Sequence, residues 1–355
     1  MRQTKRLLGS CGLVMAAGFG PLFGGCALAP ENTAALDSDV DLASDEQEIT
    51  AANLTTEAPW IVRLDLPGRM CSGSVLSEHY ILTSGHCLAG YSSNLLSSVT
   101  VRWANVPGGA QSLYTGQGWV LRNPQWHEHE IGGDTGEDIA MLQLGGSGVN
   151  LALTGRAKLW GWNSPDVNRD PWEQSSQNRW FTLIGWGLTD PSGGSSCTSG
   201  TSGDKRIGYG FKVDVTGSDS TEVHAPINTT HACGGDSGAP WLFVRGGQLI
   251  AFAVHSSRFP NLIVLGNYHR APLIKPKRDW MWEASRFNGR QLICSGAGFA
   301  GTTAFGVTYE ECHEKALPPP TPPPPSPPCP SGKRCCEPIS STVCGLCWPT
   351  SLECP

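Results

Sequence analysis

Three residues in this chain have the types that together make a serine hydroxyl nucleophilic. His86 stands before a cysteine, Asp138 opens an apolar run, and Ser237 is surrounded by glycines. A serine hydroxyl attacks poorly until a base removes its proton, and an imidazole held by a carboxylate can be that base. The three residues therefore predict acyl transfer through a covalent intermediate, with His86, Asp138 and Ser237 as the catalytic group.

The order and spacing of His86, Asp138 and Ser237 argue against one class of hydrolase that uses the same three residue types. Asp138 follows His86 by 52 residues, and Ser237 follows Asp138 by 99. An α/β-hydrolase would have the order Ser, Asp, His around a Gly-x-Ser-x-Gly elbow, and Ala239 stands where that elbow needs its last glycine. The run 139–142 after Asp138 has the pattern of a buried strand, so the acid at its start needs a buried partner, which His86 supplies.

The segments around these residues resemble the trypsin-like (chymotrypsin-fold, peptidase S1) serine proteases. The resemblance covers about residues 49–290, and its matching segments are Pro59–Leu64, Cys71–Ser77, Tyr80–Cys87, Glu137–Leu142, Gly185–Gly187 and Cys233–Pro240. It implies an all-β fold of two six-stranded antiparallel β-barrels with a C-terminal helix, which we place at Lys275–Phe287. It also implies hydrolysis of protein or peptide substrates without a cofactor.

The same resemblance assigns further roles. The backbone N–H groups of Gly235 and Ser237 would form the oxyanion hole, and Cys71 and Cys87 would form a disulfide beside the histidine. Asp236 would pair with a new N-terminal amine at Ile49, released by cleavage after Glu48. The glycines that usually follow that residue are absent, so a preformed site, or another group in place of the amine, remains open.

The substrate pocket is less well defined. Trypsin has an aspartate six residues before the nucleophile, whereas this chain has His231, so strict Arg or Lys specificity does not carry over. The best match to the pocket wall is Val254, His255 and Ser256. Two histidines at the pocket would favour an acidic or polar side chain. The alternatives are an alignment that is shifted by a residue, or a His255 that merely covers the edge of the core.

Composition supports an exported protein built of short strands. The 44 glycines and 27 prolines favour strands joined by turns. Charged residues make up 16% and the net charge is −6, which argues against a nucleic-acid partner. Fourteen cysteines indicate an oxidising compartment. In the body of the chain, between the N-terminal segments and the C-terminal linker, we expect Cys197–Cys233 and Cys294–Cys312 as further disulfides.

The beginning of the chain has the pattern of an export signal. Residues 1–26 combine a basic start with an apolar run that glycine and proline interrupt. Small residues before Cys26 resemble a bacterial lipoprotein cleavage box, so Cys26 is a candidate for lipidation and membrane attachment; cleavage after Ala29 is the alternative. Residues 27–48 are acidic and polar, as in a tether or propeptide. We expect a secreted protein or a lipoprotein of the outer membrane or cell surface.

Three segments follow the body. Residues 291–316 form a disulfide-bearing extension, 317–328 a proline-rich linker, and 329–355 a small cysteine-rich tail. The six cysteines of the tail predict disulfides of undetermined connectivity, with zinc at Cys344 and Cys347 as the less favoured alternative.

Two other functions compete with the protease. One is a catalytically silent homologue that binds proteins or surfaces, and the intact triad argues against it. The other is a surface adhesin whose tail carries the activity. The polar segment 127–137 lacks tight ligand spacing, so we interpret it as a solvated loop and not a metal site. The sequence leaves the oligomeric state open.

Overall fold

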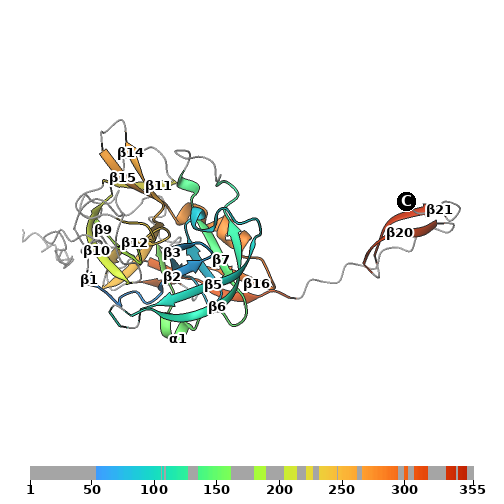
Figure 1. Ribbon diagram of the computed structural model, residues 1–355, viewed down its shortest axis with the longest axis horizontal. Coiled ribbons are helices and arrows are strands. Elements are labelled where there is room, and N and C mark those ends of the chain that lie inside the picture. Colours follow the sequence, from blue (N-terminus) through green and yellow to red (C-terminus); the bar gives the residue numbers. More distant parts are fainter. Residues whose placement is uncertain are drawn as a thin grey trace, which may run out of the picture. The chain divides into compact units, whose positions relative to one another are not determined.

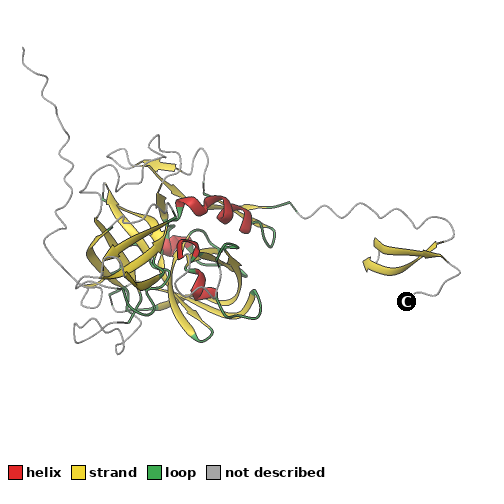
Figure 2. Cartoon of the chain, turned by 90° about the horizontal axis from the view of Figure 1, so that it is seen from above, coloured by secondary structure: helices red, strands yellow, loops and turns green. Residues whose placement is uncertain are grey.

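The computed structural model describes most of the body and two strands of the tail. The described residues are 53–104, 106–107, 109–126, 135–160, 180–188, 204–213, 221–226, 232–245, 247–261, 266–294, 300–302, 308–318, 333–340 and 343–349. Strands dominate them and the helices are short (Figure 2). None of the helices within these ranges is long and apolar enough to cross a membrane.

The first half of the body is a closed antiparallel barrel with the strand order β2-β3-β4-β7-β6-β5 (Figure 1). Its strands are β2 (Ile61–Leu66), β3 (Arg69–Val75), β4 (Tyr80–Thr83), β5 (Leu95–Trp103), β6 (Gln111–Arg122) and β7 (Ala140–Leu144). Along β2, Val62, Leu64 and Leu66 are buried and the residues between them are half-buried. This alternation has the period of a strand, and it fills the barrel with aliphatic side chains.

The sequence predicts a second six-stranded barrel, but the ladders of the described residues do not close one in the second half, whose main strands lie in two sheets. These strands are β9 (Trp180–Gly185), β10 (Arg206–Lys212), β11 (Glu222–Pro226), β12 (Pro240–Arg245), β13 (Gln248–Val254) and β15 (Gly266–Pro272). A hydrogen-bonded ladder runs β10-β9-β12-β13, and β15 pairs with β11 and with β14 (Ser257–Asn261). A bridge between Ala253 and Leu273 connects these two sheets. Stacked aromatic rings, Phe181 on Trp241 and Phe243 on Phe252, fill the core.

The predicted C-terminal helix is present and shorter than expected. A 3-10 turn, η5 (Lys275–Lys277), leads into α3 (Arg278–Ala284). Four residues after its end, Asn288 takes a φ of 48°, and Gly289 follows with 73°, a left-handed conformation that a continuing helix cannot adopt. Trp280 donates its indole N–H to the Arg122 carbonyl at 3.1 Å, so the helix lies on the first barrel after the chain leaves the second half.

The extension after the helix contacts both halves. Its strands are β16 (Arg290–Ile293), β17 (Ala300–Thr302), β18 (Thr308–Glu311) and β19 (His313–Ala316), and a disulfide joins Cys294 to Cys312. Strand β18 pairs with β8 (Lys158–Trp160), which pairs with β13 of the second half. Glu314 of β19 lies 2.8 Å from the His79 ring, beside β4 of the first barrel.

At the start of the described chain, a two-residue strand joins the second half. This strand, β1 (Asn53–Leu54), pairs with β10. Beside it Lys205 is buried and donates to the Glu57 and Ala58 carbonyls at 2.5 Å each. Burial lowers the pKa of this amine to about 7, although the nearby Glu57 charge opposes that change.

The described residues of the tail form one hairpin. Two strands of the tail, β20 (Lys333–Ser340) and β21 (Val343–Pro349), form an antiparallel hairpin. The predicted signal, tether and all but the first two residues of the proline-rich linker lie outside the described residues.

Candidate active site

His86 is held on a short turn that three groups fix from different sides. It belongs to η2 (Gly85–Leu88), and the Cys71–Cys87 disulfide ties this turn to β3. Arg69 donates to the His86 carbonyl at 2.5 Å. A Cβ at Gly85 would lie 2.9 Å from an Asp138 carboxylate oxygen, so the close approach of this turn to the acid needs glycine.

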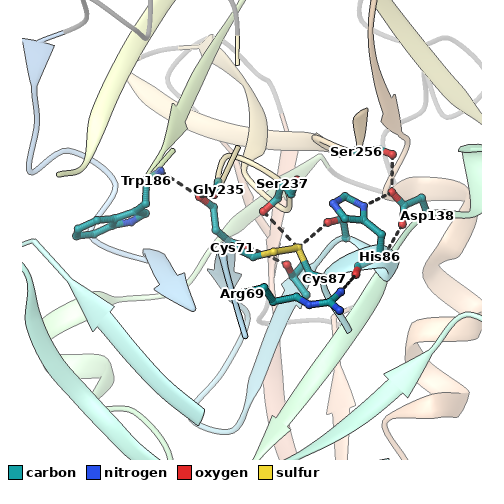
Figure 3. Close-up of a disulfide and its surroundings, with 12 residues drawn as sticks. Arg69, Cys71, His86, Cys87, Asp138, Trp186, Gly235, Ser237 and Ser256 are labelled. Carbon is teal, nitrogen blue, oxygen red and sulfur yellow. Dashed lines mark hydrogen bonds and ion pairs between the residues drawn. A yellow bond between two sulfur atoms is a disulfide. The ribbon is translucent and has the colours of Figure 1, made fainter. Parts of the chain in front are cut away.

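Asp138 lies directly between the 3-10 turn η3 (Thr135–Glu137) and β7. One carboxylate oxygen accepts the His86 backbone N–H at 2.7 Å, and the other lies 2.7 Å from His86 Nδ1 (Figure 3). The Ser256 hydroxyl donates to that second oxygen as well. Burial of Asp138 raises its pKa, but the hydrogen bonds and charge of His86, together with Ser256, outweigh burial, and the pKa is lowered below the ordinary value.

Ser237 comes from the opposite half of the body. Its carbonyl lies 3.7 Å from Cys87 Sγ and accepts the Ser72 N–H at 2.8 Å, which places the serine loop against η2 and β3. In Figure 3 the His86 ring lies between the labelled Ser237 and Asp138. The His86 side chain is 39% exposed and that of Asp138 is 5% exposed. The imidazole therefore borders solvent on one side and a buried carboxylate on the other.

The loop before Ser237 has a shape that only glycine allows. Gly235 has a φ of 97°, and a Cβ there would lie 2.4 Å from the end of the Met70 side chain. Asp236 is fully buried, and its carboxylate accepts N–H groups from Gly187 at 2.7 Å and Cys233 at 2.9 Å. These bonds join the loop to the turn that follows β9.

The remaining predicted residues divide into three groups. Val254, His255 and Ser256 are buried: the His255 ring stacks on Trp241, and Ser256 contacts Asp138. Cys233 is disulfide-bonded. Ile49, His231, Cys26 and the predicted partner Cys197 lie outside the described residues, as does most of the polar segment 127–137.

Two residues in the site have positions that the sequence did not indicate. Ser256 reaches the catalytic carboxylate, although its match to the pocket wall suggested a contact with substrate. Ser72, directly after Cys71, makes hydrogen bonds with the serine loop. The sequence placed Ser256 at the pocket wall and assigned Ser72 no role, so only the folded arrangement reveals these two contacts.

The fold is that of a trypsin-like protease, and comparison with known families agrees. The sequence model of the family described as Trypsin matches residues 50–260. This chain therefore belongs to the trypsin family, which confirms the resemblance seen in its motifs.

Individual relatives are similar over most of their own length. Trypsin Blo t 3 of Blomia tropicalis is 25% identical over 228 residues, which cover 60% of this chain and 79% of that protein. Trypsin iota of Drosophila melanogaster is 27% identical over 243 residues, or 65% and 85% of the two chains. Lectizyme of Glossina austeni is 32% identical over 204 residues, or 52% and 66%. At family level these relatives support a serine endopeptidase.

Proposed function

We propose that this chain is a serine endopeptidase that cuts protein substrates through an acyl-enzyme. Ser237 attacks the scissile carbonyl while His86 takes its proton and later donates it to the leaving amine. Asp138 holds His86 in the tautomer with the proton on Nδ1 and stabilises the imidazolium. The N–H groups of Gly235 and Ser237 bind the developing oxyanion.

The observation that carries this proposal is the pair of contacts between Asp138 and His86. The carboxylate accepts the His86 backbone N–H and lies at 2.7 Å from Nδ1, which leaves Nε2 as the ring nitrogen available to a serine hydroxyl.

Labelling with a fluorophosphonate tests the proposal. The reagent reacts with an activated serine and needs a formed oxyanion hole, so wild type should be labelled and Ser237→Ala should not. His86→Ala should lose labelling too, while Ser77→Ala, a buried serine away from the triad, should keep it. A folded protein beginning at Ile49 that resists the reagent would contradict the proposal and favour the silent, protein-binding homologue.

The activation pair belongs to the same proposal. We place the activating terminus at Ile49 and its acceptor at Asp236. The strand that follows, β1, pairs with β10, and β10 pairs with β9, which leads into the turn that holds Asp236. Mass spectrometry of the labelled protein reads its N-terminus. A labelled form that still carries residues 30–48 would rule out Ile49 as a requirement.

We also propose that the protein is exported and that its pocket residues set its specificity. The described disulfides are consistent with an exported protein, and we place removal of the signal at residues 1–26, with lipidation at Cys26 as one route to a membrane. The protease domain spans 49–290, the extension 291–316, the linker 317–328 and the tail 329–355. His231, Val254, His255 and Ser256 remain the candidate pocket residues, and a peptide library measures the specificity of the enzyme.

A further inference from the structure

Ser72 connects the first barrel to the loop that carries the nucleophile, and the proposed reaction does not use it. It lies on β3 next to the disulfide cysteine Cys71 and is fully buried. Its hydroxyl donates to the Gly235 carbonyl at 2.9 Å and accepts the Trp186 N–H at 3.1 Å. Its own N–H donates to the Ser237 carbonyl at 2.8 Å.

The hydroxyl and the backbone N–H of Ser72 thus hold the carbonyls of Gly235 and Ser237, the residues on either side of Asp236. The two residues that own these carbonyls, Gly235 and Ser237, are those whose N–H groups would bind the oxyanion. Fixing both carbonyls fixes the peptide planes that follow Gly235 and Ser237, and the chain between these planes then has little freedom to turn the two N–H groups away. Gly235 needs such restraint because glycine adopts many conformations at little cost.

The position of Ser72 is itself tightly determined. Thr83 of β4 donates its hydroxyl to the Ser72 carbonyl at 2.8 Å. A Cβ at Gly238 would lie 2.2 Å from that same carbonyl oxygen, so the serine loop approaches β3 as closely as backbone atoms allow. The hydroxyl of Ser72 is therefore presented from a rigid strand in a closed barrel.

We propose that Ser72 is a positioning residue that holds Gly235 and Ser237 in the conformation that binds the oxyanion. This inference rests on the proposed function. A preorganised oxyanion hole stabilises the transition state more than the bound substrate, and loss of a positioning group raises the barrier. Loss of the Ser72 hydroxyl should therefore lower kcat and leave KM nearly unchanged.

Ser72→Ala tests this inference against a matched control. Ser74 lies two residues further on the same strand, is equally buried, and within the described part of the chain its hydroxyl has no hydrogen-bond partner. We expect Ser72→Ala to lower kcat on a peptide substrate about tenfold. Affinity for a peptide aldehyde, which forms a tetrahedral adduct, should fall with kcat, and Ser74→Ala should retain wild-type values.

A second measurement separates failure of this inference from failure of the proposed function. In Ser237→Ala protein, the amide resonances of Gly235 and Asp236 report the conformation of the loop without any turnover. We expect Ser72→Ala in that background to shift them and to accelerate their hydrogen exchange, and Ser74→Ala to leave them in place. Unchanged amides together with an unchanged kcat would overturn the role of Ser72 even if wild type is an active protease. A fall in thermal stability alone, with kcat and amides unaltered, would make Ser72 purely structural.

Discussion

At the residue scale, the site depends on one buried carboxylate that three hydrogen bonds keep ionised. Asp138 accepts bonds from the His86 backbone, the His86 ring and the Ser256 hydroxyl. Together they lower its pKa against the effect of burial. Because the carboxyl has a lower pKa in the folded protein than in the unfolded chain, it stabilises the fold above its unfolded pKa. That contribution is lost as the pH falls through the folded pKa.

Ser256→Ala removes one of the three bonds. The pKa of the Asp138 carboxyl should then lie closer to its ordinary value, since one stabilising donor is gone. Urea unfolding between pH 7 and acid should show a smaller free energy of unfolding at neutral pH and a smaller loss of it in acid, because the pKa values of the folded and unfolded states lie closer together. A variant whose pH dependence coincides with that of wild type would show that Ser256 does not act on this carboxylate.

The three candidate catalytic residues could be picked out from the sequence because each stands in a recognisable local motif, and the structure places Asp138 against His86. A histidine before a cysteine, an acid before an apolar strand and a serine among glycines can be identified one at a time. Ser256 and Ser72 could not be found this way. Their roles come from contacts across 118 and 163 residues of chain, which only the packed halves create.

At the element scale, the loop that carries Asp138 is fixed by a buried ion pair from the C-terminal helical region. Lys277 of η5 pairs with Glu137, the residue directly before Asp138, and both side chains are almost completely buried. Asn123 donates to the Glu137 carboxylate at 2.5 Å and to its carbonyl at 3.1 Å. A segment that follows the second half therefore supports the acid of the first.

Lys277→Met should destabilise the protein strongly because it leaves a buried carboxylate without its cation. We expect a loss of about 3 kcal/mol in the free energy of unfolding, measured by urea denaturation. The double variant Glu137→Gln/Lys277→Met should recover much of this loss, since no uncompensated charge remains. Additive effects of the two substitutions would contradict a direct coupling between them. Arg156→Met, which removes the cation of a more exposed pair with Glu78, serves as the control.

The same elements show why parts of the fold were harder to predict. The sequence predicted a helix at Lys275–Phe287, whereas α3 ends at Ala284 and the chain then turns through Asn288 and Gly289 into β16. Alternating burial in β2 is visible in the sequence, whereas the pairing of β18 with β8 is not. Strand pairing between distant segments leaves no local pattern.

At the scale of the whole molecule, the extension after the helix joins the two halves that form the site. It pairs with β8 on one side and places Glu314 against His79 on the other. The Cys294–Cys312 disulfide closes this segment into a loop. Since the three candidate catalytic residues come from both halves, anything that stabilises the association of the halves should also preserve the arrangement proposed for these residues.

Removing this disulfide should cost stability without altering the chemistry. For a loop of 18 residues, chain entropy predicts that Cys294→Ala/Cys312→Ala loses about 3 kcal/mol in the free energy of unfolding. Below the new unfolding temperature, the rate of fluorophosphonate labelling should match that of wild type. Slower labelling of the folded variant would show that the extension also shapes the site.

The position of the disulfide has a mechanical consequence for a protein that carries a further segment after residue 318. Strand β19 pairs with β16 with Ala316 opposite Arg290 and His313 opposite Ile293, and the bridge lies just beyond that inner end. A pull on the tail would open this ladder from Ala316 inward and stop at Cys312. The force would then pass through the sulfur atoms into β16, so residues 295–311, including the strand that pairs with β8, would carry no tension. Tension arriving through the tail is thus diverted away from the segment that reaches the second half.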